Sequence, residues 1–231
     1  MAQPPEYNET FLREVDENLR RDQLRDFAKK YGWLIAAGVV LFLLASGGFI
    51  YWQHYKQQRA EKEVVQFTEV MRNITTGKTA EAQKQLGDLT DSSSKAVRAT
   101  ALFTSAALAL EKNDAKSATA TFRTIAEDKS LPQPYRDVAL LRQTALEFDS
   151  LQPQQVIERL APMAKPGNPW FGSAGEMTAM ALIKQGQKPQ AAQLFVAIAK
   201  DKNVPDSIRA RSVQLAGSLG VDASSAFTPA Q

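Results

Sequence analysis

A long uncharged run near the amino terminus constrains this chain more than any other feature. No formally charged residue occurs between Lys30 and Lys56, and residues 33–52 are almost entirely apolar. A helix needs about 20 predominantly apolar residues to cross the hydrocarbon core of a bilayer, so the run is long enough to span a membrane. We therefore predict a transmembrane helix over residues 32–53.

Aromatic residues flank this run at both ends, as expected for side chains at the two membrane–water interfaces. The predicted interface residues are Tyr31, Trp33, Tyr51, Trp52 and Tyr55. A buried helix of a soluble domain rarely combines so long an uncharged run with aromatic residues at both ends. A cleaved signal peptide has an apolar core of only about 7 to 15 residues and no long polar segment before it. Both alternatives therefore fit less well than a retained anchor.

Lysine and arginine residues around the run predict its orientation. Six occur from Arg13 to Lys30 and four from Lys56 to Arg72, and an excess of these residues is typical of the cytoplasmic side. Residues 1–31 are expected in the cytoplasm as a short helix continuous with the span. The rest of the chain is then expected in the periplasm, with the span in a bacterial inner membrane.

Composition excludes several kinds of chemistry. The chain has no cysteine and one histidine, which excludes disulfides, thiol nucleophiles and Cys/His zinc sites. Its net charge of +3 is spread along the sequence, whereas nucleic-acid binding requires a clustered basic face. Gly77-Lys78-Thr79 resembles the end of a phosphate-binding loop, but Arg72 stands where that motif needs glycine. We predict no catalytic, cofactor-binding or metal-binding residue, and expect neither a nucleic acid nor a small-molecule substrate.

Beyond residue 54 the apolar periodicity is helical, and the segment repeats itself. A shift of 72 to 73 residues matches two segments, and Ile74, Leu110, Leu146 and Leu182 are each 36 residues apart. The third copy is weaker, with its apolar residues one position out of register. The predicted repeat core comprises Leu110, Ala118, Phe122, Ile125, Leu146, Ile157, Leu160, Leu182, Ala191, Phe195 and Ile198.

A period near 34 residues, with Ala-x-x-x-Phe in the second helix and proline shortly beyond it, is the tetratricopeptide pattern. We predict an all-α fold, in which the transmembrane helix precedes a tetratricopeptide-like α-solenoid of about four helix pairs and a capping helix. A nonrepetitive helical bundle is the alternative. The repeat domain is expected over residues 54–220, with a disordered tail at 221–231. Helices are predicted at 58–75 with 79–90, 95–112 with 114–128, 133–148 with 153–164, 170–185 with 188–200, and 205–218.

The order of several short motifs carries a resemblance to a known family. These motifs are Phe11-x-Arg-Glu-Val-Asp-Glu17, the stretch from Arg20 to Gly32, Tyr51-Trp52-Gln-His54, and Asn168-Pro-Trp170. In this order they resemble the ancillary subunits of the SecYEG translocon that carry a tetratricopeptide-like periplasmic domain. The N-terminal segment is longer here than in the shortest family members. The resemblance implies a single-pass protein beside the channel, in contact with periplasmic chaperones, and brings no catalytic residues.

Stacked helix pairs create an extended surface that suits peptide or protein binding, so we expect a membrane-anchored binding module rather than an enzyme. The expected partners are the SecYEG translocon, periplasmic chaperones or client polypeptides, and the lipid bilayer. One alternative is a scaffold for cell-envelope assembly or division unrelated to secretion, which would copurify with division or outer-membrane assembly proteins rather than with SecYEG. Another is an enzyme, which would need an enclosed polar pocket.

Overall fold

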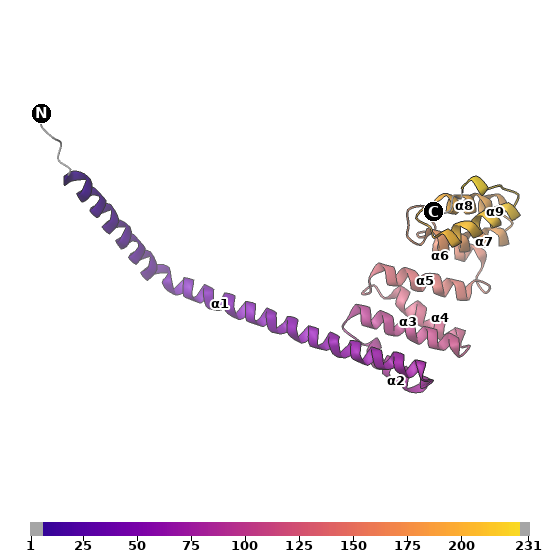
Figure 1. The fold of residues 1–231 in the computed structure, drawn as a ribbon, viewed down its shortest axis with the longest axis horizontal. Helices are drawn as coiled ribbons and strands as arrows, with labels where there is room; N and C mark the ends of the chain where they lie inside the picture. Colours follow the sequence, from indigo (N-terminus) through magenta and orange to yellow (C-terminus); the bar gives the residue numbers. More distant parts are fainter. Residues whose placement is uncertain (1–6, 227–231) are drawn as a thin grey trace, which may run out of the picture. The chain divides into compact units, whose positions relative to one another are not determined.

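The computed structural model describes residues 7–226, and it describes side chains from Lys29 onward except at four positions inside the first helix. The described part is helical and contains no strand (Figure 1). The chain divides into two compact units, residues 1–61 and 62–231. This division lies eight residues beyond the predicted start of the repeat domain at residue 54.

The first helix, α1, runs without interruption from Tyr7 to Thr75, over 69 residues. Separate helices predicted at 32–53 and 58–75 are therefore parts of one element. The residues between them offer no reason to stop a helix, because residues 53–62 contain no glycine or proline and include several strong helix formers. The predicted repeat domain thus begins inside the helix that also contains the apolar run.

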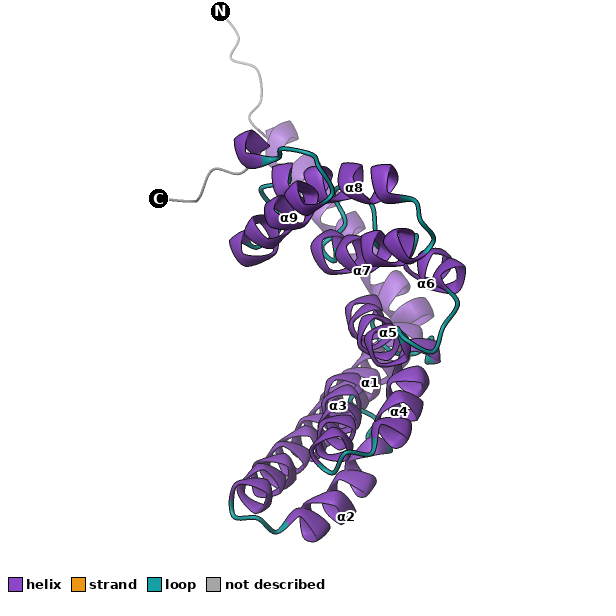
Figure 2. Ribbon diagram, turned by 90° about the vertical axis from the view of Figure 1, so that its right-hand side faces the viewer, coloured by secondary structure: helices purple, strands orange, loops and turns teal. Residues whose placement is uncertain are grey.

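Eight further α-helices follow in the described chain, and their bounds lie close to the predicted ones. They are α2 (Thr79–Thr90), α3 (Lys95–Glu111), α4 (Ala115–Glu127), α5 (Gln133–Glu147), α6 (Pro153–Leu160), α7 (Phe171–Lys184), α8 (Lys188–Lys200) and α9 (Asp206–Ser218). We call α1, α3, α5 and α7 the first helices of their pairs and α2, α4, α6 and α8 the second helices. Figure 2 shows that, within residues 62–226, α3, α5 and α7 form one row and α4, α6 and α8 the other.

Three of the four turns inside the pairs are built alike. Gly77, Asn113 and Gly186 have positive φ values of 76°, 59° and 78°, and shifts of 36 and 73 residues relate them. In each turn the next N–H donates to the carbonyl oxygen five residues before it. A left-handed residue in this position ends a helix by satisfying its last carbonyl groups. The repeat is therefore encoded in the turns as well as in the core.

The third turn differs and changes the register of the third pair. It has five residues, 148–152, where the other three have three. The buried triplets of the second helices are Ala82, Leu86 and Leu89; Ala118, Phe122 and Ile125; Val156, Leu160 and Met163; and Ala191, Phe195 and Ile198. The third triplet starts 38 residues after the second, and this offset equals 36 plus the two extra turn residues.

This offset corrects one core prediction. Ile157 is only half-buried, while Val156 and Met163, which the sequence comparison missed, are buried. Helix α6 also ends at Leu160 rather than at residue 164. Pro162 stands two residues beyond Leu160 and has no N–H to extend the helical hydrogen bonding, so Met163 packs from the turn beyond the helix.

Each inner first helix is buried on two sides. On α3, Ala101 and Leu108 pack with α1 and α2, whereas Ala99 and Ala106 pack with α4 and α5. Small side chains on both sides allow close approach of neighbouring helices. The remaining side of such a helix is left for solvent or for a ligand.

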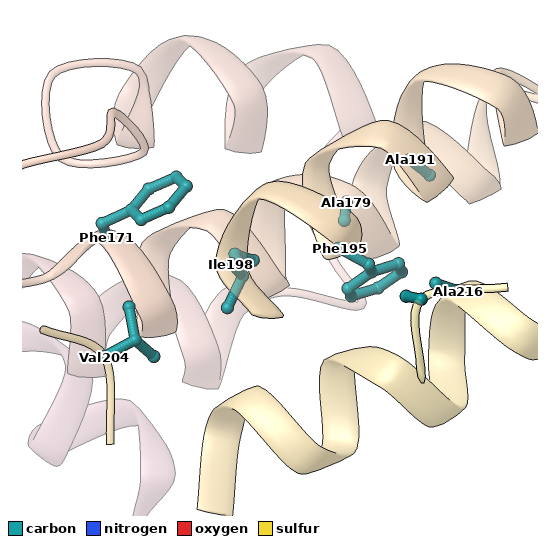
Figure 3. Packing of buried hydrophobic residues seen from close by; sticks show 8 residues of the cluster. Phe171, Ala179, Ala191, Phe195, Ile198, Val204 and Ala216 are labelled. Carbon is teal, nitrogen blue, oxygen red and sulfur yellow. The ribbon is translucent and has the colours of Figure 1, made fainter. Parts of the chain in front are cut away.

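The two ends of the stack are closed differently. The positions on α1 that correspond to Ala101 and Leu108 hold Val65 and Arg72, both exposed, and Arg72 pairs with Glu69 at 2.7 Å. At the other end, α9 covers the cluster around Phe195 (Figure 3). The exposed side chains of α9 include Asp206, Arg211 and Gln214, and a polar outer face of this kind protects the terminal repeat of a solenoid.

The predicted disordered tail is wrong for its first residues. Ala223 is buried against this same cluster, and Ser224–Ala226 form a short 3-10 helix. Apolar contact of Ala223 and Ala226 with the cluster fixes this segment. The remainder, residues 227–231, lies outside the described residues.

Candidate functional site

The large exposed apolar side chains of residues 62–226 are concentrated on the first helices. They are Val64, Val65 and Met71 on α1, Leu110 on α3, Leu146 on α5 and Met180 on α7, with Val221 near the C-terminus. No second helix carries one within this described range. Within this range, large apolar side chains are therefore exposed on the first helices and not on the second helices.

Several of these residues occupy matching positions in different repeats. A shift of 36 residues takes Met71 to Ala107 and Leu110 to Leu146, and a shift of 73 takes Ala107 to Met180. All five are exposed, and positions 107 and 110 lie one turn apart on a helix surface. We call Met71, Ala107, Leu110, Leu146 and Met180 the apolar row.

Two members of this row correct the predicted core. Leu110 and Leu146 are each 38% exposed, and the prediction that they are core residues is wrong. Leu108 and Thr144 are buried instead. A residue two positions further along a helix is rotated by about 200°, so Leu110 and Leu146 point away from the side that packs.

The other predicted core positions are distributed as follows. Leu182, like Ile157, is half-buried. The buried ones are Ala118, Phe122, Ile125, Leu160, Ala191, Phe195 and Ile198. All seven lie on second helices, where the spacing of four and then three residues keeps them on one side.

A polar cluster at the end of α5 connects three helices. Arg159 of α6 donates to Glu147 Oε2 at 2.6 Å, and Arg123 of α4 donates to Oε1 at 2.9 Å. Gln143, one turn earlier on α5, also donates to Oε2, at 3.1 Å. Burial raises the pKa of Glu147, but the hydrogen bond and charge of Arg159, with the hydrogen bonds from Arg123 and Gln143, outweigh burial, and the net pKa is lowered. The carboxylate is therefore held ionised as a structural acceptor.

Further ion pairs connect helices that are neighbours in the stack. Arg211 of α9 donates twice to the Glu176 carboxylate of α7, at 2.6 Å each. Lys184 at the end of α7 contacts Asp149 at 2.8 Å, and its ammonium lies 4.4 Å from the centre of the Phe148 ring. These cations and carboxylates are engaged with one another between neighbouring elements of the stack.

The apolar part of α1 is the second candidate site. One segment of the described chain, Lys29–Tyr55, is long and apolar enough to cross a membrane, with a mean hydropathy of 2.3 and no burial inside the structure. Tyr31 and Trp33 lie at one end, and Tyr51, Trp52 and Tyr55 at the other, and all are exposed. This exposure is costly in water, and a bilayer would remove the cost.

Among the described residues, no group of three or more histidine, cysteine, aspartate or glutamate side chains could hold a metal ion. His54 lies at the end of the apolar segment, with Gln58 Nε2 3.3 Å from its Nε2 atom. The chemistry that the apolar row supports is association with other apolar groups.

Comparison with known families agrees with the repeated helix pairs. A family model described as "Tetratricopeptide repeat-like domain" matches residues 25–215. No curated protein and no solved structure matches the chain significantly. Because the family model covers most of the 231 residues, and because the helix pairs recur at about the expected period, the chain belongs to the tetratricopeptide repeat-like domain family.

Proposed function

We propose that this protein is an ancillary subunit of the SecYEG translocon, anchored by one membrane helix, that connects the channel with periplasmic chaperones or emerging secreted chains. Membership of a repeat family whose stacks bind proteins supports the general role of a protein-interaction module. The specific partner rests on the resemblance of the motifs from Phe11 to Trp170 to the translocon family.

The proposed topology follows from the charge around the apolar segment. Residues 1–31 lie in the cytoplasm with Lys29 and Lys30 beside the membrane, residues 32–53 cross it, and the repeats lie in the periplasm. The aromatic residues from Tyr31 to Tyr55 are then interface anchors. The helix α1 contains both the apolar segment and the first helix of the first pair.

The observation that carries the proposal is the combination of two exposed apolar surfaces in one chain. None of the apolar window in Lys29–Tyr55 is buried in the described structure, and the apolar row lies on helices of the repeat unit. One surface suits lipid and partner membrane helices, and the other suits soluble protein. A protein that joins a membrane channel to soluble factors needs both.

The test exchanges residues 32–53 for an unrelated membrane-spanning helix of equal length. Insertion should persist, because hydrophobic length is sufficient for it. Copurification with SecYEG should fall, because helix pairing in lipid depends on matched packing and small residues rather than on hydrophobicity. A matched control replaces the tail from residue 227 with an unrelated sequence of equal length and should copurify normally.

Two results would contradict parts of the proposal. Copurification of the exchanged protein with SecYEG at full yield would assign the channel contact to the N-terminal segment or to the repeats instead of the membrane helix. The other is a wild-type protein that never copurifies with SecYEG but does so with division or outer-membrane assembly proteins. That second result would favour a scaffold unrelated to secretion.

A further inference from the structure

We infer that one edge of the repeat unit binds the anionic surface of a lipid bilayer through three exposed lysine residues. They are Lys165, Lys200 and Lys202, and we call them the lysine patch. This inference goes beyond the proposed function, because it concerns the membrane surface rather than the translocon and holds whatever protein the repeats bind. It rests on residues 62–226, the described part of the second compact unit.

The lysine patch lies at the edge where the chain enters the repeat unit. Short turns join the two helices of each pair, so first and second helices run in opposite directions. The connections between helices therefore alternate between two edges of the stack. Those that lead into α3, α5, α7 and α9 share the edge at which the chain enters at residue 62, and we call it the entry edge. These connections are residues 91–94, 128–132, 161–170 and 201–205.

A repeated motif of the entry edge presents lysine to solvent. Asp-Lys-Ser-Leu-Pro at 128–132 recurs 73 residues later as Asp-Lys-Asn-Val-Pro at 201–205. In each copy the aspartate accepts the N–H group two residues further on, at 2.8 and 2.9 Å. The fourth residue of each copy is buried, and the proline precedes the next helix. The lysines, Lys129 and Lys202, are exposed, and no ion pair or hydrogen bond engages their side chains among the described residues.

Acidic side chains near the lysine patch are already engaged within the protein. Glu158 accepts a hydrogen bond from Gln154 at 2.8 Å, and Asp201 accepts the backbone N–H of its own motif. Asp206 pairs with Arg209 at 2.8 Å. In the described structure no ion pair or hydrogen bond engages the three side chains of the lysine patch. The patch therefore carries positive charge that a partner can neutralise.

The earlier part of the entry edge does not share this excess of positive charge. Lys95 and Lys129 are exposed there together with Asp88, Asp91 and Glu127. Two exposed cations beside three exposed anions give no net attraction for an anionic surface. The inference is therefore confined to the connections beside α7, α8 and α9.

The two connections that supply the patch lie beside each other. A Cβ atom on Gly172, which follows the first connection, would lie 2.7 Å from Val204 Cγ1 in the second. The three ammonium groups stand on separate segments and on flexible four-carbon stems. Recognition of a single phosphate uses donors held in a fixed, convergent geometry. A broad anionic surface suits the patch better, because each lysine can meet a different headgroup.

Chain connectivity keeps the entry edge close to the membrane that residues 32–53 are proposed to span. Residues 54–61 connect this span with the repeat unit, and such a segment reaches at most about 30 Å even when fully extended. Tethering gives the headgroups a high local concentration at the edge. Each lysine near an anionic surface strengthens association about fivefold, and three together about a hundredfold. A patch of three lysines is therefore sufficient for a tethered unit.

The test measures the distance between the patch and the bilayer in the full chain. The protein is placed in nanodiscs of phosphatidylcholine, either alone or with about 30% phosphatidylglycerol, which is anionic. Because the sequence has no cysteine, Asn203→Cys provides one attachment site for a donor dye beside the patch. An acceptor dye on a lipid reports proximity through energy transfer. Both leaflets contain the same lipids, so the result does not depend on the orientation of the span.

Energy transfer should be about twofold or more stronger in the nanodiscs that contain phosphatidylglycerol, because the lysine patch is drawn to the anionic headgroups. Sodium chloride at about 0.5 M should remove most of the difference, because salt screens the attraction between exposed charges.

Two triple variants locate the contact. The first replaces the lysine patch by Lys165→Gln, Lys200→Gln and Lys202→Gln. Its matched control removes the same charge from exposed positions at the opposite edge, by Lys78→Gln, Lys116→Gln and Lys188→Gln. The first variant should lose the effect of phosphatidylglycerol, whereas the control should retain it. Arginine at the three patch positions keeps the charge and should also retain it. Thermal melting followed by circular dichroism establishes that each variant is folded.

Four outcomes would overturn the inference. Energy transfer is equal in the two kinds of nanodisc, or the patch variant keeps the effect of phosphatidylglycerol, or arginine fails to preserve it. The fourth is an equal loss in the opposite-edge variant, which would assign the attraction to net charge rather than to the entry edge. SecYEG is absent from this assay, so its result is independent of the proposed translocon role.

Discussion

Replacing Gly172 by alanine should destabilise the repeat unit, whereas the same replacement at Gly87 should stabilise it. A Cβ atom on Gly172 of α7 would lie 2.7 Å from Val204 Cγ1 and 3.3 Å from Ile208 Cγ2. A Cβ on Gly87 of α2 would meet nothing within 4 Å. Carbon atoms are in comfortable contact at about 3.5–4.0 Å, so only the first substitution forces its neighbours to move.

The magnitude follows from how little room those neighbours have. Val204 is 5% exposed and belongs to the cluster around Phe195, and a β-branched side chain has few alternative rotamers. Forcing an extra carbon into such a site costs about 1–3 kcal/mol. Alanine recovers less than about 1 kcal/mol over glycine, because Gly172 lies in the first turn of its helix. The net loss should be about 1–2 kcal/mol.

Thermal unfolding of the full chain in nanodiscs, followed by circular dichroism at 222 nm, measures this difference. In a unit of this size about 1 kcal/mol shifts Tm by roughly 2–4 °C, so Gly172→Ala should lower Tm by about 2–8 °C. Gly87→Ala should raise Tm by up to about 4 °C, because alanine favours an exposed helix interior.

A double-mutant cycle separates the close contact from other effects. Val204→Ala removes the atom that the new Cβ would meet, so Gly172→Ala should cost less in that background than in wild type. The reasoning is refuted if Gly172→Ala raises Tm as Gly87→Ala does. It is also refuted if the cost of Gly172→Ala is the same in both backgrounds.

Three further predictions follow from burial, from the Glu147 cluster and from the proposed topology. Phe195→Ala should cost about 3–5 kcal/mol, because the ring is 0% exposed, whereas Leu146→Ala should cost less than about 1 kcal/mol; equal shifts in Tm would contradict the burial pattern. The pKa of Glu147 is lowered in the folded protein, so its stabilising contribution is present above the unfolded pKa and is lost as pH falls through the folded one. Melting curves of wild type and Glu147→Gln should therefore differ near neutral pH and converge in acid, and a constant difference would contradict this role. A reporter that works only outside the cytoplasm should be active when fused after Gln231, and activity of a strictly cytoplasmic reporter at that point would invert the topology.

The sequence by itself determined the helices and most of the second-helix core. Ala118, Phe122 and Ile125 recur 73 residues later as Ala191, Phe195 and Ile198, and all six are buried. This information is local, because a helix that packs on one side must repeat its apolar residues at intervals of three and four. The ends of most helices could also be predicted from nearby residues, because prolines and left-handed turn residues end helices.

Only the tertiary structure decided the register of the third pair and the exposure of the first helices. Because the turn after α5 has two additional residues, Val156 is buried in the core and Ile157 is only half-buried. No property of an isolated residue reveals which of two adjacent apolar side chains is buried. Leu110 and Leu146 match the repeat as well as any buried leucine, yet both are exposed. A first helix packs against neighbours on two sides. The periodicity of the sequence identifies its apolar positions but does not show which side of the helix stays exposed. That side is fixed only when the pairs stack, and it is the side that we propose binds other proteins.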